Sequence, residues 1–241
     1  MLPEFYHKCL EKLLPPRQYS TLRIILLILQ SYRTIQIEKL AAILPVPIKY
    51  ESRRRHIQRF LNLSQLTVQC VWSPIIKRWL KINQNKKKIC YIAIDRTRWQ
   101  ERNLFVASLI KNKRAIPLHW MLLSKKGNSN IQEQIRLLKS VFRLLKGYQI
   151  IVIGDREFGN INLADWLSKQ GCQYVLRTKS NKYLRAENEN YQQLKSLGFQ
   201  SRKSFFCQKL SLLKKLICLE LILLFTGVNQ LRVRPIMRGG I

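Results

Sequence analysis

Two short stretches decide the fold of this 241-residue chain: YIAID at residues 91–95 and IVIGD at residues 151–155. In each, an apolar run of strand length ends in an aspartate. Ligands of mixed α/β sheets gather at the carboxyl ends of strands, so the two aspartates converge if their strands are neighbours. The pattern predicts a mixed sheet that carries two carboxylates, Asp95 and Asp155, where strands end.

The residues around these stretches predict the rest of the sheet. Apolar runs of strand length and helical apolar stripes alternate between residues 89 and 177, with a basic hairpin turn after the second strand. The order strand, strand, strand, helix, strand, helix, strand predicts a mixed sheet with helices packed on it. The expected strands are 89–94, 104–110, 116–123, 150–154 and 174–177, and the expected helices are 131–145 and 162–169.

The first 88 residues predict an all-helical region. Apolar residues recur there at helical spacing, and prolines at positions 45 and 47 break the chain before a basic helix that covers residues 53–61. A helix, a short turn and a basic helix form the outline of a helix-turn-helix. Arg53, Arg54 and Arg55 are therefore candidate DNA contacts. A solvated basic face on a helical bundle is the alternative, and it stays open.

The net charge points to a polyanionic partner. The chain has 44 Lys+Arg against 13 Asp+Glu, a formal charge of +31. Basic side chains outnumber acidic ones by 17 to 4 in residues 1–88, by 19 to 8 in residues 89–195 and by 8 to 1 in residues 196–241. Nucleic acid is the first candidate and an anionic membrane surface the second. No apolar run is long enough to span a membrane and no signal-peptide core is present, so a cytoplasmic protein is expected.

Two carboxylates close together need a cation between them. They repel each other, and one would be protonated unless a positive charge intervenes. Mg²⁺ or Mn²⁺ suits hard oxygen ligands, and a pair of such ions can activate a water or a 3′-hydroxyl at a phosphodiester. The structural alternative stays open: Asp95 and Asp155 could cap turns, or pair with Arg96 and Arg156. The six cysteines form no C-x-x-C pair, so no zinc site is expected.

Four segments resemble the bacterial insertion-sequence transposases of the cut-and-paste type, which have a DDE triad and a DRE motif. They are YIAIDRTRW (91–99), IPLHWMLLSKKGNSN (116–130), VIGDREFGN (152–160) and YVLRTK (174–179). The resemblance implies a ribonuclease-H-like catalytic core that uses a divalent metal. It also implies that the protein binds the terminal inverted repeats of its element and target DNA, with a homodimer on paired ends as a further expectation. A nucleoid-associated location follows from such a role.

The resemblance also assigns roles to single residues. Asp95 corresponds to the first catalytic carboxylate and Asp155 to the second, both as ligands of Mg²⁺ or Mn²⁺. Arg156 and Glu157 match the DRE motif, with phosphate contact implied for the arginine and the holding of a nearby basic group for the glutamate. Arg177 matches an arginine after a V-x-R strand and is expected to contact phosphate. Structural salt bridges are the alternative for these last three residues.

The third acid of the family has no counterpart in this sequence. It is a glutamate within a Y-x-x-R-x-x-x-E pattern, and no glutamate after Asp155 stands in one. The composition also changes near residue 205, as a frameshift or premature stop would cause. We therefore expect a helical DNA-binding region (1–88), a partial catalytic core (89–204), a truncated or frameshifted tail (205–241), and a transposase that is inactive as it stands. A non-catalytic DNA-binding remnant or inhibitor and a ribonuclease-H-like nuclease or resolvase are the alternatives.

Overall fold

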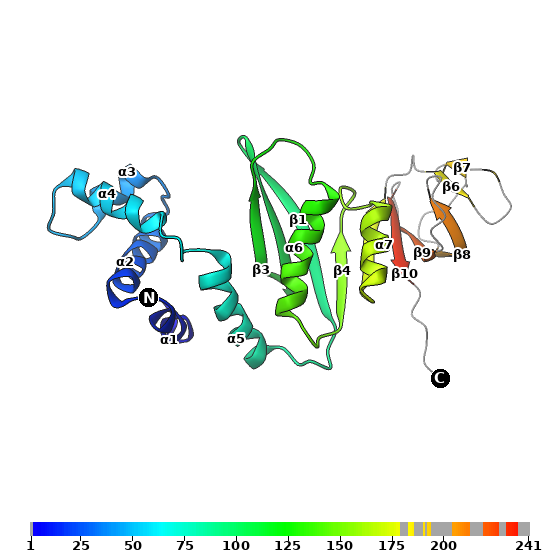
Figure 1. Cartoon of the computed structure of the whole chain (residues 1–241), viewed down its shortest axis with the longest axis horizontal. Helices are drawn as coiled ribbons and strands as arrows, with labels where there is room; N and C mark the ends of the chain where they lie inside the picture. Colours follow the sequence, from blue (N-terminus) through cyan, green and yellow to red (C-terminus); the bar gives the residue numbers. More distant parts are fainter. Residues whose placement is uncertain are drawn as a thin grey trace. The chain divides into compact units, whose positions relative to one another are not determined.

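The computed structural model describes residues 2–178 and, beyond them, residues 183–185, 190, 192–193, 204–212, 219–226 and 230–235. The chain divides into two compact units, Met1–Gln84 (unit 1) and Asn85–Ile241 (unit 2). In Figure 1 the colours follow the sequence, so unit 1 begins in blue and unit 2 ends in red. The expected boundary at residue 88 falls within a turn at the start of unit 2, where the side chain of Asn85 accepts the N–H of Lys87 at 2.9 Å. Within the described residues, no helix has the length and apolarity that crossing a membrane requires.

Unit 1 is all helical, which confirms the predicted character of this region. Its elements are α1 (Glu4–Leu13), α2 (Pro16–Tyr32), α3 (Ile37–Ile43), α4 (Tyr50–Leu61), the short η1 (Val68–Trp72) and α5 (Ser73–Asn83). One apolar cluster holds α2, α3 and α4 together as a three-helix core. Its buried members are Ile25, Ile28, Leu40, Ala41, Leu44, Ile57 and Phe60.

Unit 2 contains the predicted mixed sheet. The strands are β1 (Cys90–Trp99), β2 (Arg102–Lys111), β3 (Arg114–Leu123), β4 (Ile150–Gly154) and β5 (Gln173–Thr178), with α6 (Ile131–Leu144) and α7 (Ile161–Lys169) between the later ones. The strand order is β3-β2-β1-β4-β5. Strand β2 is antiparallel to both of its neighbours, while β1, β4 and β5 are mutually parallel. The predicted element order and the predicted mixed sheet are both confirmed.

Five more strands follow β5. They are β6 (Tyr183–Arg185), β7 (Gln192–Gln193), β8 (Ser204–Leu212), β9 (Leu219–Thr226) and β10 (Gln230–Pro235). Strand β10 pairs antiparallel with β5, and the sheet continues from it in the order β9, β8, β6, β7. The described part of residues 205–241 is thus paired backbone that extends the sheet. Its expected origin in a truncation or frameshift stays a prediction.

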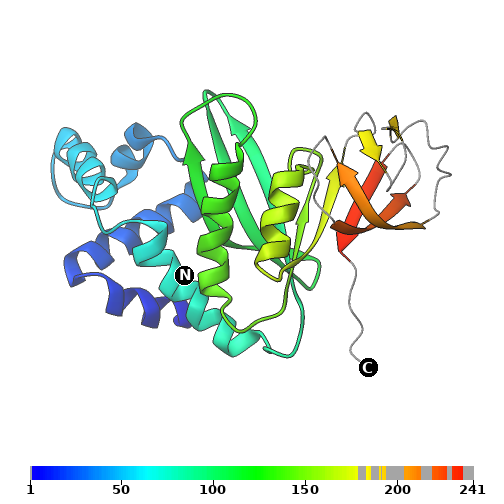
Figure 2. The ribbon, with the colours of Figure 1, turned by 45° about the vertical axis from the view of Figure 1, so that its right-hand side comes forward.

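Helices α6 and α7 cover one face of the sheet. Figures 1 and 2 both show the two helices on the same side of the strands. Ile92 and Ile94 of β1 are buried, as are Tyr174 and Leu176 of β5. The hydroxyl of Tyr174 lies 3.2 Å from the hydroxyl of Ser168 on α7, which identifies the covered face. Because side chains alternate between the two faces of a strand, the residues between these buried ones belong to the other face.

The end of β4 requires a glycine because a phenylalanine packs against it. A Cβ on Gly154 would lie 2.8 Å from Cβ of Phe158 and 3.0 Å from Cδ2 of Leu176. Phe158 is buried, and its ring stacks on Phe105 with 5.5 Å between ring centroids. The G-D-R-E-F string therefore folds back with its glycine beneath its phenylalanine.

Replacing Gly154 by alanine is expected to lower the free energy of unfolding by about 1–3 kcal/mol. The added methyl group must displace Phe158 from a close-packed core, which is the cost of overpacking. Urea unfolding followed by circular dichroism measures the difference. A wild-type midpoint in the Gly154→Ala protein would show that this contact does not restrict the turn.

Candidate active site

The register of three parallel strands places the sequence-predicted residues side by side. Ile94 of β1 is paired with Gly154 of β4, and Gly154 is paired with Leu176 of β5. Each of these residues is followed directly by one of the predicted site residues. In strand order these are Asp95, Asp155 and Arg177. Paired residues of parallel strands lie on the same level, so each of the three follows the same level of pairing on adjacent strands.

Asp95 does not stand at the end of its strand, which corrects the expectation from the YIAID pattern. Strand β1 continues to Trp99 because β2 stays paired with it, and Asp95 itself lies opposite Val106. What ends before Asp95 is the parallel pairing with β4. The aspartate is therefore the first residue of β1 that is no longer paired with β4. Its side chain is exposed, and its Oδ1 accepts the N–H of Arg96 at 2.8 Å.

Asp155 directly follows β4, as the sequence predicts, and is exposed. Its Oδ1 accepts the N–H of Glu157 at 3.0 Å, and its carbonyl oxygen accepts the N–H of Phe158 at 3.0 Å. One carboxylate oxygen thus caps the turn, as the structural alternative supposes. The ion pairs of that alternative are absent: among the described residues neither Asp155 nor Asp95 forms a salt bridge.

Glu157 lies at the centre of a buried polar cluster. Its two carboxylate oxygens accept Nε–H of Arg96 at 2.8 and 2.6 Å. The backbone N–H and the hydroxyl of Ser129 donate to Oε1 at 2.8 and 2.7 Å. The side chains of Arg96 and Glu157 are only 16% and 12% exposed. Glu157 therefore ties the turn after β4 to β1 and to the loop before α6, and it binds the arginine that the structural alternative assigned to Asp95.

Asn103 completes this cluster, and reasoning from the sequence missed it. It is fully buried on β2, and its Oδ1 accepts Nη1–H of Arg96 at 2.8 Å. Its Nδ2 donates to the carbonyl oxygens of Lys125 at 2.7 Å and Gly127 at 3.0 Å. The available signal was a lone amide beside the apolar run LFVASLI of β2. A buried amide with three partners fixes the loop after β3 against β1.

The three arginines at the start of α4 have different surroundings. Nη1 of Arg53 donates to the carbonyl oxygens of Ala42 at 3.3 Å and Leu44 at 3.1 Å, at the C-terminal end of α3. Arg54 forms salt bridges at 3.6 and 3.8 Å with the glutamates at positions 38 and 51. Arg55 is exposed, and no described carboxylate pairs with it. Of the three, Arg55 is the one whose charge is available to a ligand.

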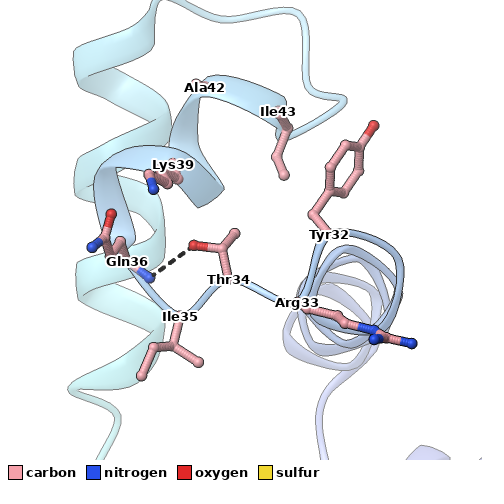
Figure 3. Close-up of a pocket in the computed structure, with 8 residues that line it drawn as sticks. All are labelled: Tyr32, Arg33, Thr34, Ile35, Gln36, Lys39, Ala42 and Ile43. Carbon is pink, nitrogen blue, oxygen red and sulfur yellow. Dashed lines mark hydrogen bonds between the residues drawn. The ribbon is translucent and has the colours of Figure 1, made fainter.

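A hollow lies between the end of α2 and α3 in the same unit (Figure 3). Thr34 shapes its wall, because its hydroxyl accepts the N–H of Gln36 at 3.4 Å. Arg33 and Lys39 supply positive charge, and no carboxylate lines the hollow. The full lining is Tyr32, Arg33, Thr34, Ile35, Gln36, Lys39, Ala42 and Ile43. Unit 1 thus presents a positively charged surface beside α3 as well as on α4.

The pair of aspartates fits a divalent cation. Both carboxylates are exposed and follow the same pair of residues, Ile94 and Gly154, and no described cation is paired with either. Two carboxylates brought together in this way would repel each other, and an ion between them would remove the repulsion. Their oxygens are the ligands that Mg²⁺ and Mn²⁺ prefer. In the part of the chain that the structure describes, no group of three or more His, Cys, Asp or Glu side chains could hold a metal. The candidate ligands that the described residues offer are therefore limited to these two carboxylates.

The chain is similar to a family model and to solved structures. The family model described as "Transposase DDE domain" matches residues 86–218. Among solved structures, the chain is similar to the piggyBac transposase in a synaptic complex with hairpin DNA, with 15% identity and a TM-score of 0.43 over 89% of this chain and 47% of that one. This chain therefore covers about half the length of that transposase. It is also similar to Marinitoga piezophila Argonaute in complex with a 5′ OH guide RNA, with 14% identity and a TM-score of 0.28 over 86% of this chain and 32% of that one.

No curated protein sequence matches this chain. The family match spans both candidate aspartates and the buried cluster around Glu157, and it covers more than half of the residues. The chain belongs to the transposase DDE domain family.

Proposed function

We propose that this chain acts in DNA transposition, as a transposase that cleaves and transfers DNA strands at the ends of an insertion sequence. One observation carries the proposal: Asp95 and Asp155 follow the last paired residues of two neighbouring parallel strands. Both carboxylates are exposed, and neither pairs with a described cation. The transposase DDE domain match spans both positions.

The residues of this chain would divide the work at the site. Asp95 and Asp155 would hold Mg²⁺ or Mn²⁺, and such an ion would polarise a phosphodiester and stabilise its leaving oxygen. Arg177 lies on the same level of the sheet, and Arg156 is exposed directly after the second aspartate. Their guanidinium groups suit bidentate contact with phosphate oxygens, which would orient the DNA backbone. Glu157 has a positioning role, because both of its carboxylate oxygens accept hydrogen bonds from Arg96 and one of them also accepts from Ser129.

Unit 1 is the proposed binding region for the terminal inverted repeats. Its three-helix core presents α4 after a short turn from α3, as in a helix-turn-helix. Arg55 on α4 is exposed, and the cations of the hollow beside α3 add positive charge that duplex DNA would neutralise. A homodimer on paired ends would bring two such units to two repeats.

Arg55 and Arg53 offer a matched test of this assignment. We expect Arg55→Gln to weaken duplex binding and to reduce the slope of log K against log salt concentration by about 1, with an unchanged melting temperature. We expect Arg53→Gln to lower the free energy of unfolding by about 1–2 kcal/mol, because two carbonyls at the end of α3 lose their donor. Salt titrations of binding and thermal unfolding measure both. An Arg55→Gln protein that binds with the wild-type salt slope would remove Arg55 from the DNA interface.

A second candidate function is DNA binding without cleavage, as a remnant or an inhibitor of active copies. The observation in its favour is the ligand count: the described residues offer two carboxylates, and no glutamate after Asp155 stands in a Y-x-x-R-x-x-x-E pattern. Two carboxylates hold a divalent ion weakly, so strand cleavage by this chain is expected to be slow.

The deciding experiment uses duplexes that carry the sequences flanking the gene. Gel shifts measure binding, and denaturing gels measure nicking, each with Mg²⁺, Mn²⁺ or EDTA. Metal-dependent nicking at the element ends supports the transposase. Binding to the ends that is insensitive to metal and free of nicking supports the second candidate. Equal binding to flanking and unrelated duplexes would contradict recognition of element ends in both.

A further inference from the structure

The end of the unit 2 sheet at which the parallel strands begin lies opposite the two aspartates, and we refer to it as an edge of the sheet. Strands β1 and β4 run parallel from Cys90 and Ile150, so the segments before them meet at this edge, where the N–H of Cys90 donates to the carbonyl oxygen of Gln149 at 2.8 Å. The turn between β2 and β3 lies there too, because Ile110 is paired with Tyr91 near the start of β1. Figure 1 shows the segment before β1 and the loop between α6 and β4 at the same end of the sheet.

Six basic side chains from these three segments gather at this edge, and we name them the strand-start surface. All six are exposed, and none forms a salt bridge with a described carboxylate. Two of the segments are close neighbours, because a Cβ on Gly147 would lie 3.9 Å from Nζ of Lys86. The six are Lys86, Lys87, Lys88, Lys113, Arg114 and Lys146.

Within residues 85–178, the carboxylates lie elsewhere. Glu101 follows β1, Glu133 is in the first turn of α6 and Glu157 follows β4, so all three lie toward the edge with the two aspartates. Asp165 lies within α7 and is paired with Lys169 at 2.8 Å. A hollow of about 540 Å³ adjoins the strand-start surface, and its polar lining includes lysine and glutamine side chains but no carboxylate. The positive charge of this surface is therefore not compensated by the acids of residues 85–178.

We propose that the strand-start surface binds the phosphate backbone of a duplex DNA segment, separate from the duplex at the aspartates. Its segments extend across four adjacent strands, at the starts of β3, β1 and β4 and the end of β2, which is about 14 Å at the usual strand spacing. This width resembles the ~12 Å major groove, so the lysines can reach phosphates on both of its sides. Lysines contact phosphate as point charges and read no base, so binding would be independent of sequence. The sheet would then hold two DNA segments at its opposite edges.

This inference relies on the proposed function only for DNA as the ligand, because the binding needs neither metal nor cleavage. The test uses the full chain in EDTA with a short random-sequence duplex and measures affinity over a series of salt concentrations. The test variant combines Lys86→Gln, Arg114→Gln and Lys146→Gln, one from each segment. The control variant removes the same charge from three lysines that are already paired with acids. These are Lys8, Lys126 and Lys169, each changed to Gln.

We expect the test variant to bind duplex about tenfold or more weakly, with a salt slope smaller by about 2–3, and the control variant to keep the wild-type slope. Equal losses in the two variants would overturn the proposal, since net charge alone would explain them. The proposal would also be overturned if the test variant bound duplex normally and lost affinity only for single-stranded RNA or for vesicles rich in phosphatidylserine. The surface would then bind another polyanion.

Lysine acetylation read by mass spectrometry locates the contact without a variant. Duplex DNA should protect Lys86 and Lys146 from acetylation and leave Lys169, which is paired with Asp165, unchanged. Equal modification of Lys86 and Lys146 with and without DNA would contradict the assignment. Both measurements are independent of Asp95 and Asp155, so a failure of metal-dependent cleavage leaves their outcome intact.

Discussion

Replacing Glu157 by alanine is expected to lower the free energy of unfolding of unit 2 by about 3–5 kcal/mol. The side chains of Glu157 and Arg96 are both largely buried, so the variant leaves the guanidinium without its charge partner. Ser129 also loses the acceptor of its N–H and its hydroxyl. Urea unfolding followed by circular dichroism measures the loss.

A surface pair provides the matched control. Glu101 pairs with Lys126 at 2.6 Å, but their side chains are 72% and 62% exposed. Exposed ion pairs contribute little to the free energy of unfolding, so Glu101→Ala should lower it by less than about 1 kcal/mol. Glu157→Gln keeps an acceptor for Ser129 and should fall between the two. If Glu157→Ala and Glu101→Ala cost the same, the buried cluster does not hold the turn after β4 in place.

Replacing either aspartate by asparagine is expected to reduce metal-dependent nicking by about 100-fold or more. Each change removes one negative charge from a site whose oxygens would hold the cation, and loss of such electrostatic stabilisation has effects of this size. Labelled duplexes with the element ends, analysed on denaturing gels in Mn²⁺, measure the residual nicking. Both side chains are exposed, so Asp95→Asn and Asp155→Asn should keep the wild-type melting temperature.

The affinity of the aspartate variants for DNA distinguishes a loss of catalysis from a general loss of function. Affinity of either aspartate variant for the element ends should stay within about twofold of wild type, because unit 1 and the basic surfaces are unchanged. Asp165→Asn is the matched control: this aspartate pairs with Lys169 on α7, away from the proposed site, and its change should leave nicking intact. Nicking retained in Asp95→Asn or Asp155→Asn would remove that residue from the catalytic role.

The element order of unit 2 was predictable because each element carries its own local pattern. The run before Asp155 is apolar and short, and α6 begins with a capping box in which Asn130 and Glu133 bond each other's backbone N–H groups. The end of β1 was not predictable in the same way. Strand β1 extends past Asp95 because β2 remains its partner there, and which neighbour continues a strand is a property of the assembled sheet.

The strands that precede the candidate acids were predictable from the sequence, and the side chains packed around them were not. Asp95 and Asp155 follow the same pair of residues only because β1 and β4 are neighbours; the sequence left this as a condition, and the sheet shows it. The role of Asn103 was not predictable, because its partners, Arg96 and the loop after β3, come together only through hairpin pairing and loop closure. Arg53 resembled its neighbours in sequence, yet tertiary packing directs it to the end of α3.

Binding of Mn²⁺ to the purified chain, followed by electron paramagnetic resonance, tests the central claim most directly, since it requires no DNA and no cleavage. If the two aspartates share one ion, the wild-type chain removes Mn²⁺ from the free signal at one site, and Asp95→Asn and Asp155→Asn each abolish that site while Asp165→Asn preserves it. Wild-type binding in both single variants would contradict the account, because the two carboxylates would then not hold a common metal.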